Sequence, residues 1–134
     1  METELAFPFN AGAVVYAINV PKVSAFYVEV AGLRTTHAEQ GHAVLESAGF
    51  QLVVVAIPPH IAASIQVTVP PQRREDTAVK LVLPVSSIAS ARLAAQACGG
   101  QLNPPEREWE FQGSRVCDGH DPEGNVVQFR QNAL

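Results

Sequence analysis

The chain has little basic charge and no long apolar run, and each shortage excludes a class of protein. Lys and Arg total nine of 134 residues, the net charge is −4, and the only adjacent basic pair is Arg73–Arg74. Binding to nucleic acid needs a basic stripe, so we expect no nucleic-acid partner. The longest apolar run, Leu52–Pro59, is too short to cross a bilayer, so we expect no membrane partner.

Cysteine is also scarce. Cys98 and Cys117 stand far apart in the chain and form no metal-binding or redox motif. We interpret them as buried thiols of a reducing compartment. The acidic segment Met1–Glu4 lacks the positive charge that opens a signal peptide, which favours a cytoplasmic location.

What the chain does have is enough apolar sequence to fold, with 47% hydrophobic and 16% charged residues. Alternation predicts a strand at Ala13–Ile18. A helix follows, with Asn19 as its N-cap and Gly32 at its C-terminal end. Its apolar stripe comprises Val20, Val23, Phe26, Tyr27 and Val30. Three strands are then predicted at Arg34–His37, Ala43–Ser47 and Phe50–Ile57, the last dense in valine and expected to be buried on both faces.

Residues 58–77 differ from their surroundings and read as a connection between two halves. Pro58–Pro59 and Pro70–Pro71 bracket most of this segment. Within it, Ile61–Val69 is predicted to form either a short helix or an edge strand.

After this connection the order of elements restarts. A strand is predicted at Ala78–Val85, and a helix runs from a cap at Ser86 or Ser87 to Cys98. Further strands are predicted near Gln101–Leu102, Glu108–Phe111, Ser114–Asp118 and Val126–Gln131. The sequence therefore predicts one α+β domain over residues 1–134, built from two βαβββ modules at about 12–57 and 78–131. The modules must pair, because one helix leaves a sheet face bare.

The segment Asp121–Asn125 is the most informative in the chain. Asp-Pro-Glu-Gly-Asn suits a tight turn, and Val127 and Phe129 can then pack on a helix while Gln128 and Arg130 face the other way. Together with the following Val-Val-Gln-Phe, this run resembles the C-terminal signature of the vicinal oxygen chelate superfamily. That group includes glyoxalase I, the bleomycin resistance proteins and the extradiol dioxygenases. Tyr16–Pro21, Ala25–Tyr27 and Gly32–Leu33 resemble its first strand and helix.

The resemblance implies a curved mixed sheet around a cavity, usually within a homodimer. In metal-dependent members, side chains from both modules hold one divalent cation, which chelates adjacent oxygens of the substrate. Aligned on the family's motifs, the ligand positions fall on Gly12, Lys80, Gln128 and a Leu or Val within Phe50–Ile57. Such a cation needs three or four oxygen or imidazole donors, so we expect no metal and no other cofactor.

The four histidines do not pair at a helical spacing. His37 and His42 flank a Glu39-Gln40-Gly41 turn, and His60 lies in the connection. We interpret these as surface or loop residues. His120, next to Asp118 and Asp121, is the best candidate for an exception, although a turn stabilised by its own side chains explains it equally well.

The substituted ligand positions still predict a small-molecule pocket. Strand alternation places Gln128 and Arg130 on one face, with Lys80 from the second module and Tyr16 from the first. Trp109 adds an aromatic wall. We expect these five residues to bind the ligand, with Lys80 and Arg130 favouring an anionic or carbonyl-bearing molecule.

Three functions remain open at this point. The first is a homodimeric binding protein of the bleomycin-resistance type that holds a small organic molecule without the family's metal. The second is an enzyme of the superfamily, a glyoxalase-like lyase or isomerase or a dioxygenase, with a shifted divalent-metal site or none. The third is a structural or regulatory dimer whose cavity is filled.

Overall fold

The computed structural model describes residues 11–132, so the acidic segment at the N-terminus lies outside the described residues. The first module comprises β1 (Ala11–Ala17), α1 (Val20–Ala31), β2 (Arg34–Glu39), β3 (His42–Ser47) and β4 (Phe50–Ala56). The connection contains one short helix, α2 (Pro59–Ala62). The second module comprises β5 (Leu81–Pro84), α3 (Ile88–Ala97), β6 (Gln101–Leu102), the 3-10 helix η2 (Pro105–Arg107), β7 (Trp109–Phe111), β8 (Ser114–His120) and β9 (Val126–Asn132).

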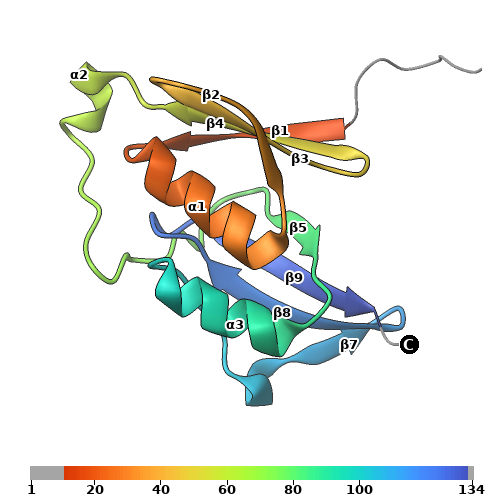
Figure 1. Ribbon diagram of the computed structural model, residues 1–134. Coiled ribbons are helices and arrows are strands. Elements are labelled where there is room, and N and C mark those ends of the chain that lie inside the picture. The colour runs from red at the N-terminus through yellow and green to blue at the C-terminus, as the bar shows by residue number, and fades with distance from the viewer. Residues whose placement is uncertain (1–10, 133–134) are drawn as a thin grey trace, which may run out of the picture.

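The two modules share one topology, which confirms the predicted α+β fold. The first sheet has the order β1-β4-β3-β2, and the second has β5-β9-β8-β6 with β7 also paired to β8 (Figure 1). In the first sheet β1 runs parallel to β4, and in the second β5 runs parallel to β9. All other neighbouring strands are antiparallel. The strand that follows α3 is split into β6 and β7, because residues 103–108 leave the sheet between them.

Helix α1 begins and ends where its sequence predicts. The Asn19 side chain accepts a hydrogen bond from the Lys22 amide at 3.0 Å, and Gly32 ends the helix in the left-handed conformation with φ 71°. Helix α3 is capped in the same way, because the Ser87 hydroxyl accepts a hydrogen bond from the Ser90 amide at 3.1 Å. Both helices are therefore defined by local sequence.

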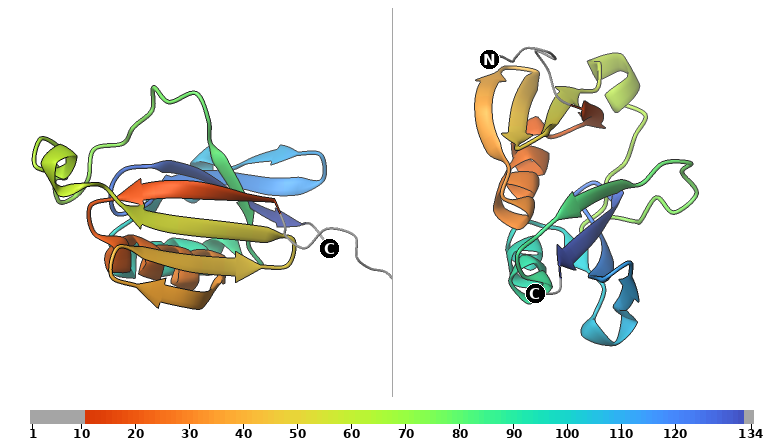
Figure 2. Two further views of the ribbon diagram at one scale, coloured as in Figure 1. Left: turned by 90° about the horizontal axis from the view of Figure 1, so that it is seen from above. Right: turned by 90° about the vertical axis from the view of Figure 1, so that its right-hand side faces the viewer.

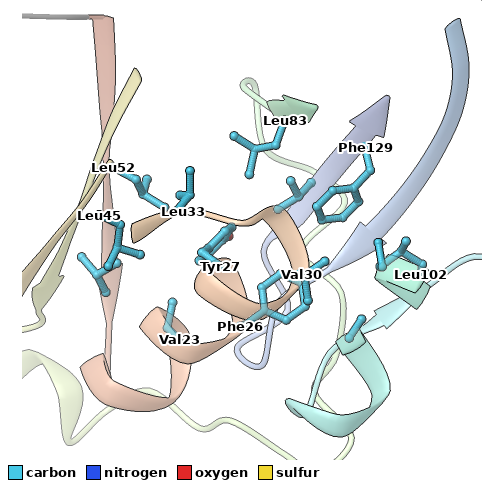
Figure 3. Packing of buried hydrophobic residues seen from close by; sticks show 14 of the residues in the cluster. Val23, Phe26, Tyr27, Val30, Leu33, Leu45, Leu52, Leu83, Leu102 and Phe129 are labelled. Atoms are coloured by element: carbon cyan, nitrogen blue, oxygen red, sulfur yellow. The ribbon is translucent and has the colours of Figure 1, made fainter. Parts of the chain in front are cut away.

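One core joins the two modules. Helices α1 and α3 pack side by side, and α1 also contacts β3 and β4 (Figures 1 and 2). In Figure 3 the buried side chains of α1 lie between Leu45 and Leu52 on one side and Leu102 and Phe129 on the other. The ring centroids of Phe26 and Phe129 are 6.4 Å apart. Burial of these apolar side chains holds the modules together.

Several strands differ from their predicted limits by one or two residues, and three predicted elements differ more substantially. Strand β4 is not buried on both faces, because Leu52 and Val54 are buried while Val53 and Val55 on the opposite face are half-exposed. Strand β5 begins at Leu81 rather than Ala78. Residues 61–69 contain no strand, and the helical alternative is met only by α2, which ends at Ala62. None of residues 61–69 pairs with a strand of either sheet, and the proline pairs on both sides of this segment supply no amide donor that could extend a pairing into it.

Each sheet has one face covered by the helices and one free of them. In β1, Ala13, Val15 and Ala17 face the core, so Val14 and Tyr16 point to the opposite side. In β9, Val127 and Phe129 are buried, and Gln128 and Arg130 lie on the free side. No helix within residues 11–132 is long and apolar enough to cross a membrane. Both cysteines are free thiols. Cys117 is buried as predicted, whereas Cys98 is only half-buried, and partial or complete burial raises the pKa of each thiol.

Candidate ligand-binding site

The turn Asp121–Asn125 is the point where the modules are tied together. Asp121 is completely buried, and its Oδ1 accepts hydrogen bonds from the amides of Glu123 at 2.9 Å and Asn125 at 3.1 Å. Its Oδ2 accepts from the Tyr27 hydroxyl at 2.8 Å and from Asn125 Nδ2 at 2.9 Å. The carboxylate therefore closes its own turn and also binds helix α1 of the first module.

Glu123 and Gly124 of the same turn add further contacts, Glu123 to the first module and Gly124 to the connection. The Glu123 carboxylate accepts hydrogen bonds from the amides of Ile18 at 2.9 Å and Asn19 at 2.8 Å, at the entrance to α1. Gly124 has φ 88°, and its carbonyl accepts a hydrogen bond from the Arg74 amide at 2.9 Å. The motif that carries the family resemblance is thus a structural junction of both modules and the connection.

Tyr27 makes this junction sensitive to high pH. Burial raises the pKa of the Tyr27 phenol well above its ordinary value, and the charge of Asp121 and its hydrogen bond raise it further. A raised folded-state pKa gives stability that is complete below about pH 10 and is lost as the pH rises through the folded value. We expect the free energy of unfolding of the wild type to fall above pH 10 by up to about 1.4 kcal/mol per pH unit more than that of Tyr27→Phe. Urea unfolding of both proteins from pH 8 to 11 measures this, and parallel profiles would contradict it.

A cleft of about 320 Å³ opens next to this junction. Val14 and Tyr16 of β1 form one wall, and Val126 of β9 forms part of the other. The connection contributes Arg74 and Thr77, and Val79 lies between the connection and β5. Tyr16 is 61% exposed, which is unusual for an aromatic residue on a strand. An apolar cleft with a few polar groups is the usual form of a small-molecule site.

The free face of the second sheet carries a connected polar cluster. Lys80 Nζ lies 2.9 Å from Asp118 Oδ2, and Gln128 Nε2 donates to Asp118 Oδ1 at 3.3 Å. Arg130 Nε in turn donates to Gln128 Oε1 at 2.9 Å. Two cations and one carboxylate leave this cluster with an excess of positive charge.

Aromatic side chains border the cluster. The Arg130 guanidinium lies 5.0 Å from the centre of the Phe111 ring, within the range of a cation–π contact. Trp109 is on the same strand two residues away and is 40% exposed. Trp109 and Arg130 both pair with Val116, so they lie on one face on opposite sides of β8.

The structure brings four of the five predicted site residues to the free face of the second sheet and places the fifth, Tyr16, on the first sheet. Two of the four lie on β9, namely Gln128 and Arg130. Trp109 lies on β7, and Lys80 directly precedes β5 and contacts Asp118 of β8. Tyr16 lies across the cleft on the other sheet. The sequence did not point to Asp118 as a site residue, whose only signal was its strand position opposite Gln128. It also did not point to Arg74, Thr77 and Val79, which line the cleft ahead of β5.

The four positions implied by the family do not fit a divalent cation. Gly12 has no side chain, and a Cβ there would approach the Gln51 carbonyl oxygen to 2.5 Å. On β4, Val53 and Val55 on the free face offer no donor. Lys80 is an ammonium paired with a carboxylate, and the oxygen of Gln128 is already bound by Arg130. A site of this composition lacks the oxygen and imidazole donors that such a cation requires.

His120 is not a metal ligand candidate in this arrangement. It is buried, and its Nδ1 lies 3.0 Å from the Asp121 carbonyl oxygen. The carboxylates of Asp118 and Asp121 are held by other partners. The turn-stabilising role of His120 is therefore the one the structure supports.

Comparison with known proteins identifies the fold. No protein-family model matches the chain, and no curated protein matches it. A glyoxalase/bleomycin resistance protein from Albidiferax ferrireducens T118 superposes with a TM-score of 0.64 at 16% identity, covering 92% of this chain and 98% of that one. The bleomycin resistance determinant encoded on transposon Tn5 superposes with a TM-score of 0.58 at 17% identity, covering 94% of this chain and 99% of that one. TnmS3, an antibiotic binding protein from Streptomyces sp. CB03234, superposes with a TM-score of 0.61 at 21% identity, covering 97% of this chain and 100% of that one. The chain thus has the glyoxalase/bleomycin resistance fold, as its motifs predict.

Proposed function

We propose that this protein binds a small organic molecule, aromatic and either anionic or carbonyl-bearing, on the helix-free faces of its sheets. The binding uses no metal at the four family positions. The observation that carries the proposal is the cluster of Lys80 and Arg130 beside the exposed rings of Trp109 and Phe111. Among proteins of the same fold, TnmS3 is described as an antibiotic binding protein, which supports a binding role.

The two kinds of side chain in this cluster supply different parts of the recognition. Trp109 and Phe111 offer flat apolar surface on which a planar ring can stack. Arg130 is held in position by Gln128 and Phe111, so its guanidinium loses little freedom when it binds an anion. Asp118 orients Lys80 and is the group that a bound carboxylate or sulfonate would compete with.

We also propose that the binding form is a homodimer in the cytoplasm. Large apolar side chains are exposed on the free faces of both sheets, namely Val14, Tyr16, Val82, Trp109 and Phe111. A second copy would remove part of this surface from water. Two free thiols are typical of a reducing compartment. Light scattering coupled to gel filtration measures the oligomeric state.

The test of binding uses a matched pair of probes, 1-anilinonaphthalene-8-sulfonate and the uncharged N-phenyl-1-naphthylamine. We expect the sulfonate to bind more tightly and to quench the single Trp109. Arg130→Gln is expected to weaken the sulfonate by about tenfold, the loss of one charge-assisted hydrogen bond at a half-buried site. The same substitution should change binding of the uncharged probe little.

Lys22→Gln is the matched control for Lys80→Gln. Both remove one lysine, but Lys22 lies on α1, on the helical side of the first sheet. We expect Lys80→Gln to weaken binding of the sulfonate probe and Lys22→Gln to leave that binding unchanged. Equal affinity of the two probes for the wild type, or equal effects of the two lysine substitutions, would contradict the proposed anion site.

A further inference from the structure

The tip of the β2–β3 hairpin brings together His37, Glu39 and His42, of which the two histidines were predicted to be surface or loop residues on either side of a turn. His37 Nε2 lies 2.5 Å from Glu39 Oε2, and the rings of His37 and His42 are 5.4 Å apart. One donor atom from each of these three residues lies within 4.8 Å of the other two. The hairpin thus presents two imidazoles and one carboxylate at a single point.

Strand geometry explains this convergence. His37 and Glu39 are two residues apart on β2, so their side chains point to the same face. Glu39 pairs directly with His42 on β3, which places His42 on that face as well. The turn between the strands passes through Gly41 at φ 106°, a conformation that favours glycine. The three donors are therefore held by the register of the hairpin rather than by a flexible loop.

The donor set is one that divalent transition metals prefer. Imidazole suits Zn²⁺, Ni²⁺ and Cu²⁺, whereas Mg²⁺ and Ca²⁺ prefer oxygen alone. Four-coordinate Zn²⁺ holds donors at about 2.0–2.1 Å from the metal, which separates neighbouring donors by about 3.3 Å in a tetrahedron. The observed separations, from 2.5 Å up to 4.8 Å, bracket that value. The three donor atoms therefore lie near the spacing that a bound zinc ion requires.

We propose that His37, Glu39 and His42 bind one divalent transition-metal ion at the hairpin tip. Three protein donors leave at least one coordination position open to water or to an exogenous anion. The site lies on β2 and β3, and β2 is the strand of the first sheet farthest from β1. It shares no residue with the four family positions, so it is independent of the ligand-binding proposal.

The simplest competing explanation is a hydrogen bond alone. The side chains of His37 and Glu39 are 52% and 59% exposed, and an exposed pair of this kind can form without any metal. The two explanations differ in what they require of His42, because the hydrogen bond needs only His37 and Glu39. His42→Ala is therefore the discriminating variant.

The experiment titrates Zn²⁺ into tag-free, chelator-treated protein in competition with a chromophoric chelator. We expect one site per chain in the wild type. His42→Ala and His37→Ala should each lower the affinity for zinc by at least about 10- to 100-fold, because the loss of even a residue that only hydrogen-bonds to a metal ligand costs that much. Glu39→Gln removes the charged donor at constant size and should also weaken binding. Co²⁺ should give the intense visible absorption of a four-coordinate site in the wild type only.

His60→Ala is the matched control, because His60 is exposed on α2 outside the hairpin cluster. It should bind zinc as the wild type does. The proposal is overturned if the wild type takes up no more zinc than the His37→Ala/His42→Ala double variant, or if His60→Ala loses as much affinity as His42→Ala. Sulfonate-probe binding is measured on the same double variant and should be unchanged, which separates this site from the proposed ligand site.

Discussion

Asp121→Ala is expected to lower the free energy of unfolding by about 3–5 kcal/mol, one of the two largest effects we expect for this protein. The carboxylate accepts four hydrogen bonds in a completely buried position. Its removal leaves the Tyr27 hydroxyl and the amides of Glu123 and Asn125 without their acceptor. A domain of this size has about 5–15 kcal/mol in total, so much of its stability depends on one side chain.

Two substitutions separate the parts of this effect. Tyr27→Phe removes only the bond to helix α1 and should cost about 1–2 kcal/mol. Asp121→Asn keeps the shape of the side chain and one acceptor oxygen, so we expect an intermediate loss. Urea unfolding of the three variants and of the Tyr27→Phe/Asp121→Ala double variant measures the coupling. If Asp121→Ala cost no more than Tyr27→Phe, the turn would not depend on its aspartate.

Gly124→Ala is expected to lower the free energy of unfolding by about 2–5 kcal/mol, through two additive causes. The residue has φ 88°, a conformation that costs a non-glycine residue about 1–2 kcal/mol. In addition, a Cβ at Gly124 would clash with the carbonyl oxygen of Gln72, because the connection runs directly against the turn. Backbone atoms cannot rotate away as a side chain can, so either the turn or the connection must move.

Gly113→Ala is the matched control for this prediction. Gly113 has φ 84°, almost the same conformation, but nothing lies within 4 Å of a Cβ placed there. It should therefore show only the conformational part of the loss. Movement of the connection in Gly124→Ala should also speed tryptic cleavage after Arg73 and Arg74, whereas Gly113→Ala should not. Equal losses of stability in the two variants would show that the clash with Gln72 is relieved without cost.

Much of the fold could be predicted from short-range sequence. Helix α1 follows its predicted cap at Asn19 and its predicted end at Gly32, because capping depends on neighbouring residues only. Val127 and Phe129 are buried and Gln128 and Arg130 are not, as strand alternation requires. The limits of β5 and the exposure of β4 were not predictable in the same way, since they depend on which other segment covers them.

The candidate site was predictable only in part. The sequence placed Gln128 and Arg130 on one face, but it did not show that Asp118 pairs with Lys80 across 38 residues. It placed His37 and His42 on either side of a turn but did not predict that their rings meet, because the distance between the rings depends on the register of a hairpin rather than on spacing in the chain. Contacts of this kind require a known strand pairing.

The turn Asp121–Asn125 shows the division most clearly. Its residue types by themselves determined a tight turn before a strand whose apolar side faces a helix, because those properties arise from local backbone preferences and from side-chain alternation. Only the tertiary structure decided that Glu123 binds the amides of Ile18 and Asn19, 105 and 104 residues away. That contact exists because both modules bury their helices in one core, which brings the turn to the entrance of α1. A long-range partner of this kind has no local signal in the sequence.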